Sequence, residues 1–294
     1  MPHPKAHHLV SRGYLKSWSD DGRRVLYIDK QTRSTQLVGM RAIFVEPGLL
    51  TVRTADETSA PLETAFSDVE NQAIPLVRSY IAGSNGDDNR QAVIALMALH
   101  FARSFSLRIG YERLYQEQVG QMLAEAPTDM ELKEAFQRQY GRAPSTRELR
   151  ALIKDTAADH ARANLGYVES VEHMYNKALE YFEPMHLQRC RVLTPNRGEL
   201  LVSDSPVLIN SGAEGTATAP VALMDADLLW FPLSPQVGVS ISTEPIAEAS
   251  LNEAATRKLN LRVWDYAVRY LAARSGANIN RALGYPDPKI EIDR

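Results

Sequence analysis

The chain has 294 residues, of which 44% are hydrophobic and 23% charged, and a formal net charge of −3. This composition is that of an ordinary globular protein, and it excludes disordered and collagen-like chains as well as domains that coat nucleic acid through an overall basic surface. The single cysteine, Cys190, excludes an internal disulfide framework and a cysteine-rich zinc site.

Short strands are expected in the first part of the chain. Residues 20–22 (Asp-Asp-Gly) are a turn signal, and residues 25–29 carry the β-branched and aromatic side chains typical of a strand. We expect residues 36–38 to pair back with that strand and residues 44–54 to add a further extended segment. A small N-terminal sheet follows from this pattern.

A helical period of 3.6 residues begins near residue 59. It predicts a helix that starts at Pro61 and that Pro75 kinks or breaks, because an internal proline removes a hydrogen bond. After a loop at residues 83–88, a second helix is predicted from about 89 to 124.

Capping boxes then predict two further helix starts, at Thr128/Glu131 and at Ser145/Glu148. The second of these helices is expected to extend to about residue 185. Residues 125–185 are therefore predicted to form a helical layer or arm.

After residue 185 the hydrophobic period returns to two, which is typical of strands. A third capping box, Ser250/Glu253, predicts the last helix. The strands expected in this part of the chain are residues 191–194, 199–202, 228–231 and 237–241.

Strands and helices occur in separate blocks along the chain, which favours an α+β fold over an alternating α/β fold. We expect a small mixed or antiparallel sheet, built jointly from N- and C-terminal strands, that packs on a mainly helical middle region. The whole chain, residues 1–294, is expected to form a single compact domain with the helical arm attached.

The N-terminal residues lack the apolar core of a secretory signal, and no run approaches the roughly 20 apolar residues needed to cross a bilayer. These observations predict a cytoplasmic protein that does not contact a membrane.

Several short segments, separated along nearly the whole chain, form one ordered pattern: residues 7–20, 25–30, Glu63 and Glu70, 100–103, 201–207, 231–235 and 260–270. Together they resemble a bacterial family known as the domain of unknown function family 4238. This chain departs from the family pattern at His100, where glutamine is more usual, and at Ser205, where asparagine is more usual. The family implies no established activity, so the resemblance marks candidate positions without assigning their roles.

Polar residues on apolar helix faces are the most informative feature of the sequence. Glu63 and Glu70 are seven residues apart and His100 and Arg103 are three apart, so each pair shares one helix face. A carboxylate beside core residues has to be paired or neutralised. A partnership between Arg103 and Glu70 would satisfy that need.

The first interpretation of these residues is a polar pocket between two helices, closed by the N-terminal segment and the turn at residues 203–204. His8, Glu70 and Asp204 would supply the mixed nitrogen and oxygen ligands that suit a divalent metal. Such a site would activate water for phosphoester hydrolysis, as in a nuclease or phosphodiesterase that acts on nucleic acid or a nucleotide.

In that interpretation the catalytic residues are His8, Glu70, His100, Arg103 and Asp204. Arginine and lysine side chains suit an anionic substrate such as a phosphate. The residues expected to bind substrate are Tyr14, Lys16, Glu63 and Ser203.

The second interpretation is a non-enzymatic binding or effector protein, for example a component of a bacterial defence or toxin system. The same polar residues then form a buried salt-bridge network, and Asp204 hydrogen-bonds to the backbone of its own turn. Residues 125–185 would bind a protein partner. This interpretation predicts exposed apolar residues on the arm and a closed polar network.

Overall fold

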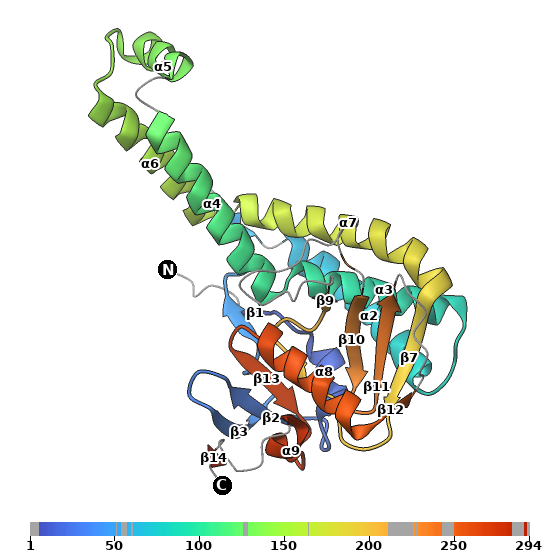
Figure 1. Ribbon diagram of the computed structural model, residues 1–294. Coiled ribbons are helices and arrows are strands. Elements are labelled where there is room, and N and C mark those ends of the chain that lie inside the picture. Colours follow the sequence, from blue (N-terminus) through green and yellow to red (C-terminus); the bar gives the residue numbers. More distant parts are fainter. Residues whose placement is uncertain are drawn as a thin grey trace.

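The computed structural model shows an α+β protein with a compact body and a helical arm that projects from it (Figure 1). The structure describes residues 6–50, 52–53, 58–59, 61–125, 129–163, 165–210, 226, 228–242, 250–283 and 291–292.

The central five-stranded sheet comes from the C-terminal part of the chain. Neighbouring strands are antiparallel, except that β12 runs parallel to β7. All described side chains of β10 and β11 are buried except the first of each strand. The strand order is β12 (Ser250–Leu251), β7 (Cys190–Pro195), β11 (Val237–Ser242), β10 (Leu228–Ser234) and β9 (Leu208–Asn210).

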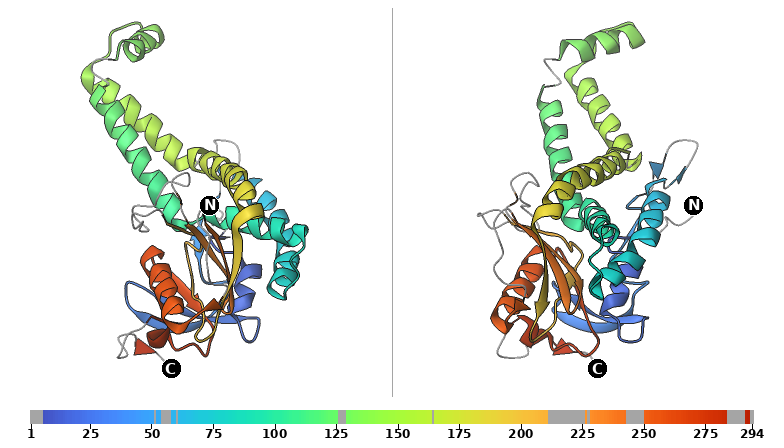
Figure 2. Two further views of the ribbon diagram at one scale, coloured as in Figure 1. Left: turned by 45° about the vertical axis from the view of Figure 1, so that its right-hand side comes forward. Right: turned by 90° about the vertical axis from the view of Figure 1, so that its right-hand side faces the viewer.

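The two faces of this sheet belong to two different cores. Leu229 and Phe231 point into the larger core, together with residues of α2 (Pro61–Ile81), α3 (Asp87–Ala102) and α7 (Leu165–Arg189). Trp230 points to the opposite face, against α8 (Glu253–Tyr266). The right-hand view of Figure 2 shows the sheet between α8 on one side and α2 and α3 on the other. Alternation along a strand buried on both faces produces this division.

The second five-stranded sheet joins the two ends of the chain, which confirms that N- and C-terminal strands share a sheet. β2 pairs with β3 on one side and with the C-terminal β13 on the other. The sequence pattern did not separate this sheet from the central one. Its strand order is β14 (Glu291–Ile292), β3 (Ser34–Gly39), β2 (Arg24–Asp29), β13 (Tyr270–Ala273) and β8 (Val202–Ser203).

Shorter elements connect these layers. β1 (Ala6–His8) pairs with β4 (Val45–Pro47), and β5 (Val52–Arg53) pairs with β6 (Thr58–Ser59). The remaining short helices are α1 (Arg12–Leu15), the 3-10 helix η1 (Lys16–Trp18) and α9 (Ile279–Leu283).

Helix α2 runs through Pro75 without a break, so of the two expected effects the break is wrong. Pro75 and Asn71 are both exposed, and the carbonyl group that loses its hydrogen bond to a proline nitrogen therefore faces water. The single helix predicted at 89–124 is divided into two in the structure. The division occurs at Ser104, whose hydroxyl accepts the N–H of Leu107 at 3.3 Å and caps a new helix.

The capping box at Ser145 and Glu148 is confirmed. The Glu148 N–H donates to the Ser145 hydroxyl at 3.2 Å, and the Ser145 N–H donates back to the Glu148 carboxylate at 2.9 Å. The last helix begins later than its capping box indicated, with Asn252 as the N-cap residue.

The arm consists of α4 (Phe105–Glu125), α5 (Met130–Tyr140) and α6 (Thr146–Ala163), which extend away from the body (Figures 1 and 2). A small core of its own holds it together, formed by Leu123, Leu132, Leu149 and Ile153. Helix α7 packs along α3 in the larger core. The projecting part is thus residues 105–163, whereas the sequence indicated 125–185.

No single helix of the described residues is long and apolar enough to span a membrane; α3 and α4 reach that length and composition only as a pair, across a bend of 42°.

Close packing in the central sheet predicts that Gly238→Ala destabilises the protein. A Cβ atom at Gly238 would lie 2.0 Å from the buried ring of Trp230, so the ring or the strand has to shift. We expect a loss of about 1–3 kcal/mol of unfolding free energy, measured by urea denaturation. Gly39→Ala is the control, since an added Cβ there has no neighbour within 4 Å. Equal stability of the two variants would contradict this account.

Candidate functional site

A cluster of polar side chains lies where β1 meets α2 and α3. The Nδ1 atom of His7 is 3.0 Å from the Glu63 carboxylate, and His7 is buried while Glu63 is partly exposed. This bond, followed by the charges of His7 and Arg103, lowers the pKa of Glu63 against the opposing effect of burial. His7 was not among the predicted site residues. The signal in the sequence was the apolar Leu9 two residues later, because alternate residues of a strand share a face, and both side chains are buried.

His8 is the least satisfied side chain of this cluster. Its ring hydrogen-bonds the backbone of Met40, whereas its buried Nε2 has no hydrogen-bond partner among the described residues. Burial lowers the pKa of His8, and the positive charges of Arg103 and Arg12 lower it further. A neutral imidazole with one nitrogen engaged keeps a lone pair on the other, so His8 Nε2 has the electronic form of a base or an acceptor.

Arg103 and Glu70 form the ion pair expected for a carboxylate that lies beside core residues. The Arg103 Nη2 donates to Glu70 Oε1, which joins the C-terminal end of α3 to the middle of α2. Both side chains are largely withdrawn from solvent, Arg103 more so than Glu70. The buried Nε of Arg103 has no hydrogen-bond partner within the described part of the chain.

His100 is held at both ring nitrogens by the backbone. Its Nδ1 donates to the Leu96 carbonyl at 2.8 Å, and its Nε2 accepts the Ser11 N–H at 3.1 Å. Burial, followed by the charge of Arg103, keeps the pKa of His100 well below its usual value. Both sites of a neutral imidazole are therefore occupied, and the ring connects Ser11, the N-cap of α1, to α3.

Asp204 lies in a different environment, against the segment between α8 and β13. Its carboxylate accepts the backbone N–H groups of Val268, Arg269 and Tyr270 at 2.8–2.9 Å. The hydroxyl of neighbouring Ser203 donates to the Ser205 carbonyl and accepts the Ser205 N–H. The polar side-chain atoms of Ser203 and Asp204, two predicted site residues, are therefore engaged with the backbone and hold the local chain in place.

Two predicted substrate-binding residues have different surroundings. Tyr14 is buried, donates its hydroxyl hydrogen to the Pro232 carbonyl and stacks on Phe231 with ring centroids 5.2 Å apart. Lys16 is exposed on η1. Tyr14 thus joins α1 to the central sheet.

The structure therefore brings together part of the predicted set. His8, Glu63, Glu70 and Arg103 meet between β1, α2 and α3, and His7 joins them. His8, Glu70 and Asp204 do not form the predicted metal-binding group. Within the described part of the chain, no three His, Cys, Asp or Glu side chains are arranged to hold a metal ion.

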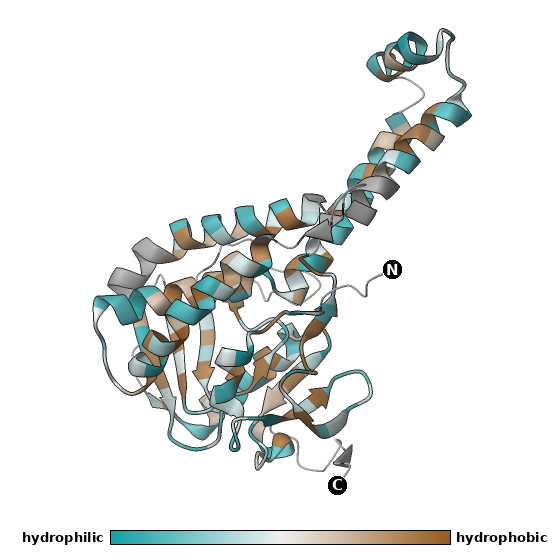
Figure 3. Ribbon diagram, turned by 180° about the vertical axis from the view of Figure 1, so that it is seen from behind, coloured by the Kyte–Doolittle hydropathy of each residue, from teal (hydrophilic) through white to brown (hydrophobic). Residues whose placement is uncertain are grey.

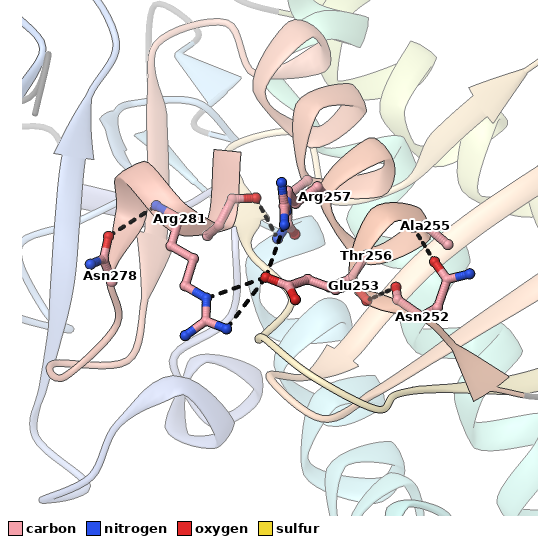
Figure 4. Close-up of polar contacts among 9 residues, drawn as sticks. Asn252, Glu253, Ala255, Thr256, Arg257, Asn278 and Arg281 are labelled. Atoms are coloured by element: carbon pink, nitrogen blue, oxygen red, sulfur yellow. Dashed lines mark hydrogen bonds and ion pairs between the residues drawn. The ribbon is translucent and has the colours of Figure 1, made fainter. Parts of the chain in front are cut away.

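A second polar cluster, which the sequence analysis did not identify, joins α8 to α9 (Figure 4). Glu253 accepts hydrogen bonds from Arg257 at 2.9 Å and from Arg281 at 3.3 Å. The side chains of Asn252 and Asn278 accept N–H groups in the first turns of the two helices. A cavity of about 410 Å³ lies beside the cluster. Because Glu253 of α8 pairs with Arg281 of α9, the cluster serves to hold α9 against α8.

Comparison with known proteins gives a family and no nearer relative. A family model described as "Protein of unknown function (DUF4238)" matches residues 6–277. Neither a curated protein nor a solved structure matches the chain.

The buried Asp204 predicts a distinct pH dependence of stability. Burial raises the pKa of Asp204 from 3.8 to about 6, although three backbone N–H groups oppose the shift. The folded state then binds this proton more tightly than the unfolded state. The Asp204 contribution is fully present below pH 3.8 and is lost as pH rises through about 6, a change of about 3 kcal/mol.

Urea unfolding of wild type and Asp204→Asn between about pH 4 and pH 7 measures this contribution as the difference between the two curves. The advantage of wild type over the variant should shrink as the pH rises. Asp68→Asn, on the exposed side of α2, is the control and should follow wild type. A constant difference between wild type and Asp204→Asn would rule out the raised pKa.

Proposed function

This chain belongs to the family DUF4238, and we propose that it is a non-enzymatic interaction protein that assembles through its helical arm. The observation that supports this proposal is the apolar surface that the arm exposes to solvent. Four of the six large hydrophobic side chains that are exposed in the described residues lie on the arm: Leu114 (55%), Met122 (54%), Met130 (70%) and Tyr140 (54%).

Helix α4 has little packing to hold it in its extended position. Of its 21 residues only Ser106, in the first turn, is buried. Hydrophobic segments alternate with hydrophilic ones along the arm (Figure 3). Helices in water depend mainly on the packing of an apolar face. A second surface laid on α4 would therefore stabilise the arm and remove its apolar side chains from water.

The partner that we propose is the arm of a second copy of this chain. Charges of both signs alternate along α4, with Arg108 paired to Glu112 and Arg113 to Glu117. A surface of mixed sign is complementary to itself when a two-fold axis relates two copies. Two antiparallel arms would also complete a four-helix arrangement, which is a stable way to bury helix faces.

The predicted site residues of the body support this proposal because most of their polar atoms are engaged within the protein. Both nitrogens of His100 bind backbone groups, and so do both carboxylate oxygens of Asp204 in its separate environment. Arg103 and Glu70 bind each other. The contacts of His100 and His7 suit a network that fixes the N-terminal segment on α2 and α3.

The variant Leu114→Glu/Met122→Glu tests the proposed assembly. Sedimentation velocity should show wild type associating as its concentration rises, whereas the variant stays monomeric because charges replace the apolar contact. Leu37→Glu is the matched control, since Leu37 is an exposed leucine on β3 and away from the arm. A wild type that remains monomeric at every concentration, or a variant that associates as wild type does, would refute the arm as the interface.

A phosphoester hydrolase is the second candidate, favoured by two nitrogens of one cluster, Nε2 of His8 and Nε of Arg103, that no described residue engages. A histidine base and an arginine anion-binding group are the parts that such a reaction uses.

The hydrolase candidate predicts release of nitrophenolate from bis(para-nitrophenyl) phosphate, tested with added magnesium or manganese. Loss of a general base at His8→Ala should reduce the rate by about 100-fold or more. His173→Ala, on the exposed side of α7, should retain the wild-type rate. Equal rates in wild type, His8→Ala and a protein-free blank would exclude this activity.

A further inference from the structure

An apolar cavity lies on the side of the central sheet away from the polar cluster. It has a volume of about 460 Å³, which is within the range of small-molecule sites. Its walls come from β7, β9, β10, β11 and β12 on one side and from α8 on the other. The apolar lining includes Leu193, Leu208, Leu228, Trp230, Leu251 and Leu259.

The register of the sheet explains why these residues share one face. Trp230 of β10 lies opposite Ser240 of β11 and opposite Leu208 of β9. Leu193 of β7 lies opposite Gly238, two residues before Ser240. Residues that face each other across strands point to the same side of a sheet, so the floor of the cavity consists of these cross-strand neighbours.

Two polar groups on this floor have no partner among the residues that the structure describes. The Nε1 of Trp230 and the Oγ of Ser240 are buried and make no hydrogen bond there, and both residues line the cavity. Buried polar atoms are nearly always satisfied, because an unsatisfied group costs stability. Indole Nε1–H is only a donor, and a hydroxyl can donate too. The missing group is therefore an acceptor.

Gly238 keeps this space open. The ring of Trp230 lies so close over Gly238 that any side chain there would overlap it. A larger residue at this position would push the indole toward α8 and into the cavity. The glycine thus lets the indole lie flat on the sheet.

Positive charge lies on the α8 side of the cavity. Lys258 and Arg262 are one helical turn apart and both line the cavity. Lys258 is exposed, and no carboxylate of the described residues forms an ion pair with it. Cations beside an apolar space favour a ligand with an apolar body and a negative head.

We propose that this cavity binds an amphipathic organic anion, such as a medium-chain carboxylate. The apolar body contacts the leucine-rich walls, and the carboxylate accepts hydrogen bonds from the indole of Trp230 and the hydroxyl of Ser240. Lys258 and Arg262 stabilise its charge. The polar groups that line the cavity, on the floor and on α8, are all able to donate hydrogen bonds. This accounts for the preference for an anion over a cation.

The test uses the 294-residue chain, decanoate as the probe and the three indole N–H signals in a ¹H–¹⁵N correlation spectrum. Trp230→Phe identifies the signal of Trp230. Decanoate should move that signal downfield as a new hydrogen bond forms. The Trp18 signal is the internal reference and should stay in place, since its Nε1 already donates to the Leu200 carbonyl at 3.0 Å.

Variants separate the charge from the apolar body. Lys258→Met/Arg262→Met should weaken decanoate binding at least tenfold. Lys177→Met removes an exposed positive charge from α7, outside the cavity lining, and should leave binding unchanged. Ala255→Phe, which fills the cavity from α8, should abolish binding. It leaves in place the hydrogen bond that caps the helix, in which the Ala255 N–H donates to the Asn252 side chain. Circular dichroism confirms that each variant is folded.

Decanol, the uncharged analogue of decanoate, tests whether the negative charge of the probe matters. If decanol and decanoate move the Trp230 signal equally, the site has no preference for an anion and the proposal is overturned. A Trp230 signal that does not move with saturating decanoate overturns it as well. This outcome is independent of the assembly of the arm, because the residues that line the cavity come from outside α4, α5 and α6.

Discussion

The body of this protein depends on one constraint, which is that β10 and β11 are buried on both faces. A sheet of this kind has to be covered on two sides, and the chain provides α2, α3 and α7 for one side and α8 for the other. The helix layers therefore follow from the strands. The second core differs in that a cavity of about 460 Å³ lies between the sheet and α8.

The N-terminal segment is fixed to this body by polar contacts and by aromatic packing. His100 links Ser11 to α3, and Tyr14 links α1 to the central sheet through the Pro232 carbonyl. His7 adds a bond to Glu63 on α2. Buried polar groups of this kind are costly when one partner is missing, so together they specify a single position for the segment.

The arm and the cavity share a physical feature, since both are places where the protein leaves an interaction incomplete. On the arm, large apolar side chains face water along a helix with almost no buried residue. In the cavity, an indole and a hydroxyl lack partners among the described residues of the apolar walls. Incomplete packing and incomplete hydrogen bonding are both relieved by binding, which is why the proposals concern partners in the two cases.

The sequence by itself determined the α+β class and most strands and helices, because periodicity acts over a few residues. It also indicated that Glu70 and Arg103 could pair, because a carboxylate beside core residues needs a partner. Tertiary structure alone decided the partners of His7, His100 and Asp204, which are 56 to 66 or 89 positions away along the chain. The same holds for the division into two sheets and for the cavity. Local patterns contain no information on which distant strands become neighbours, so these features arise only when the chain packs.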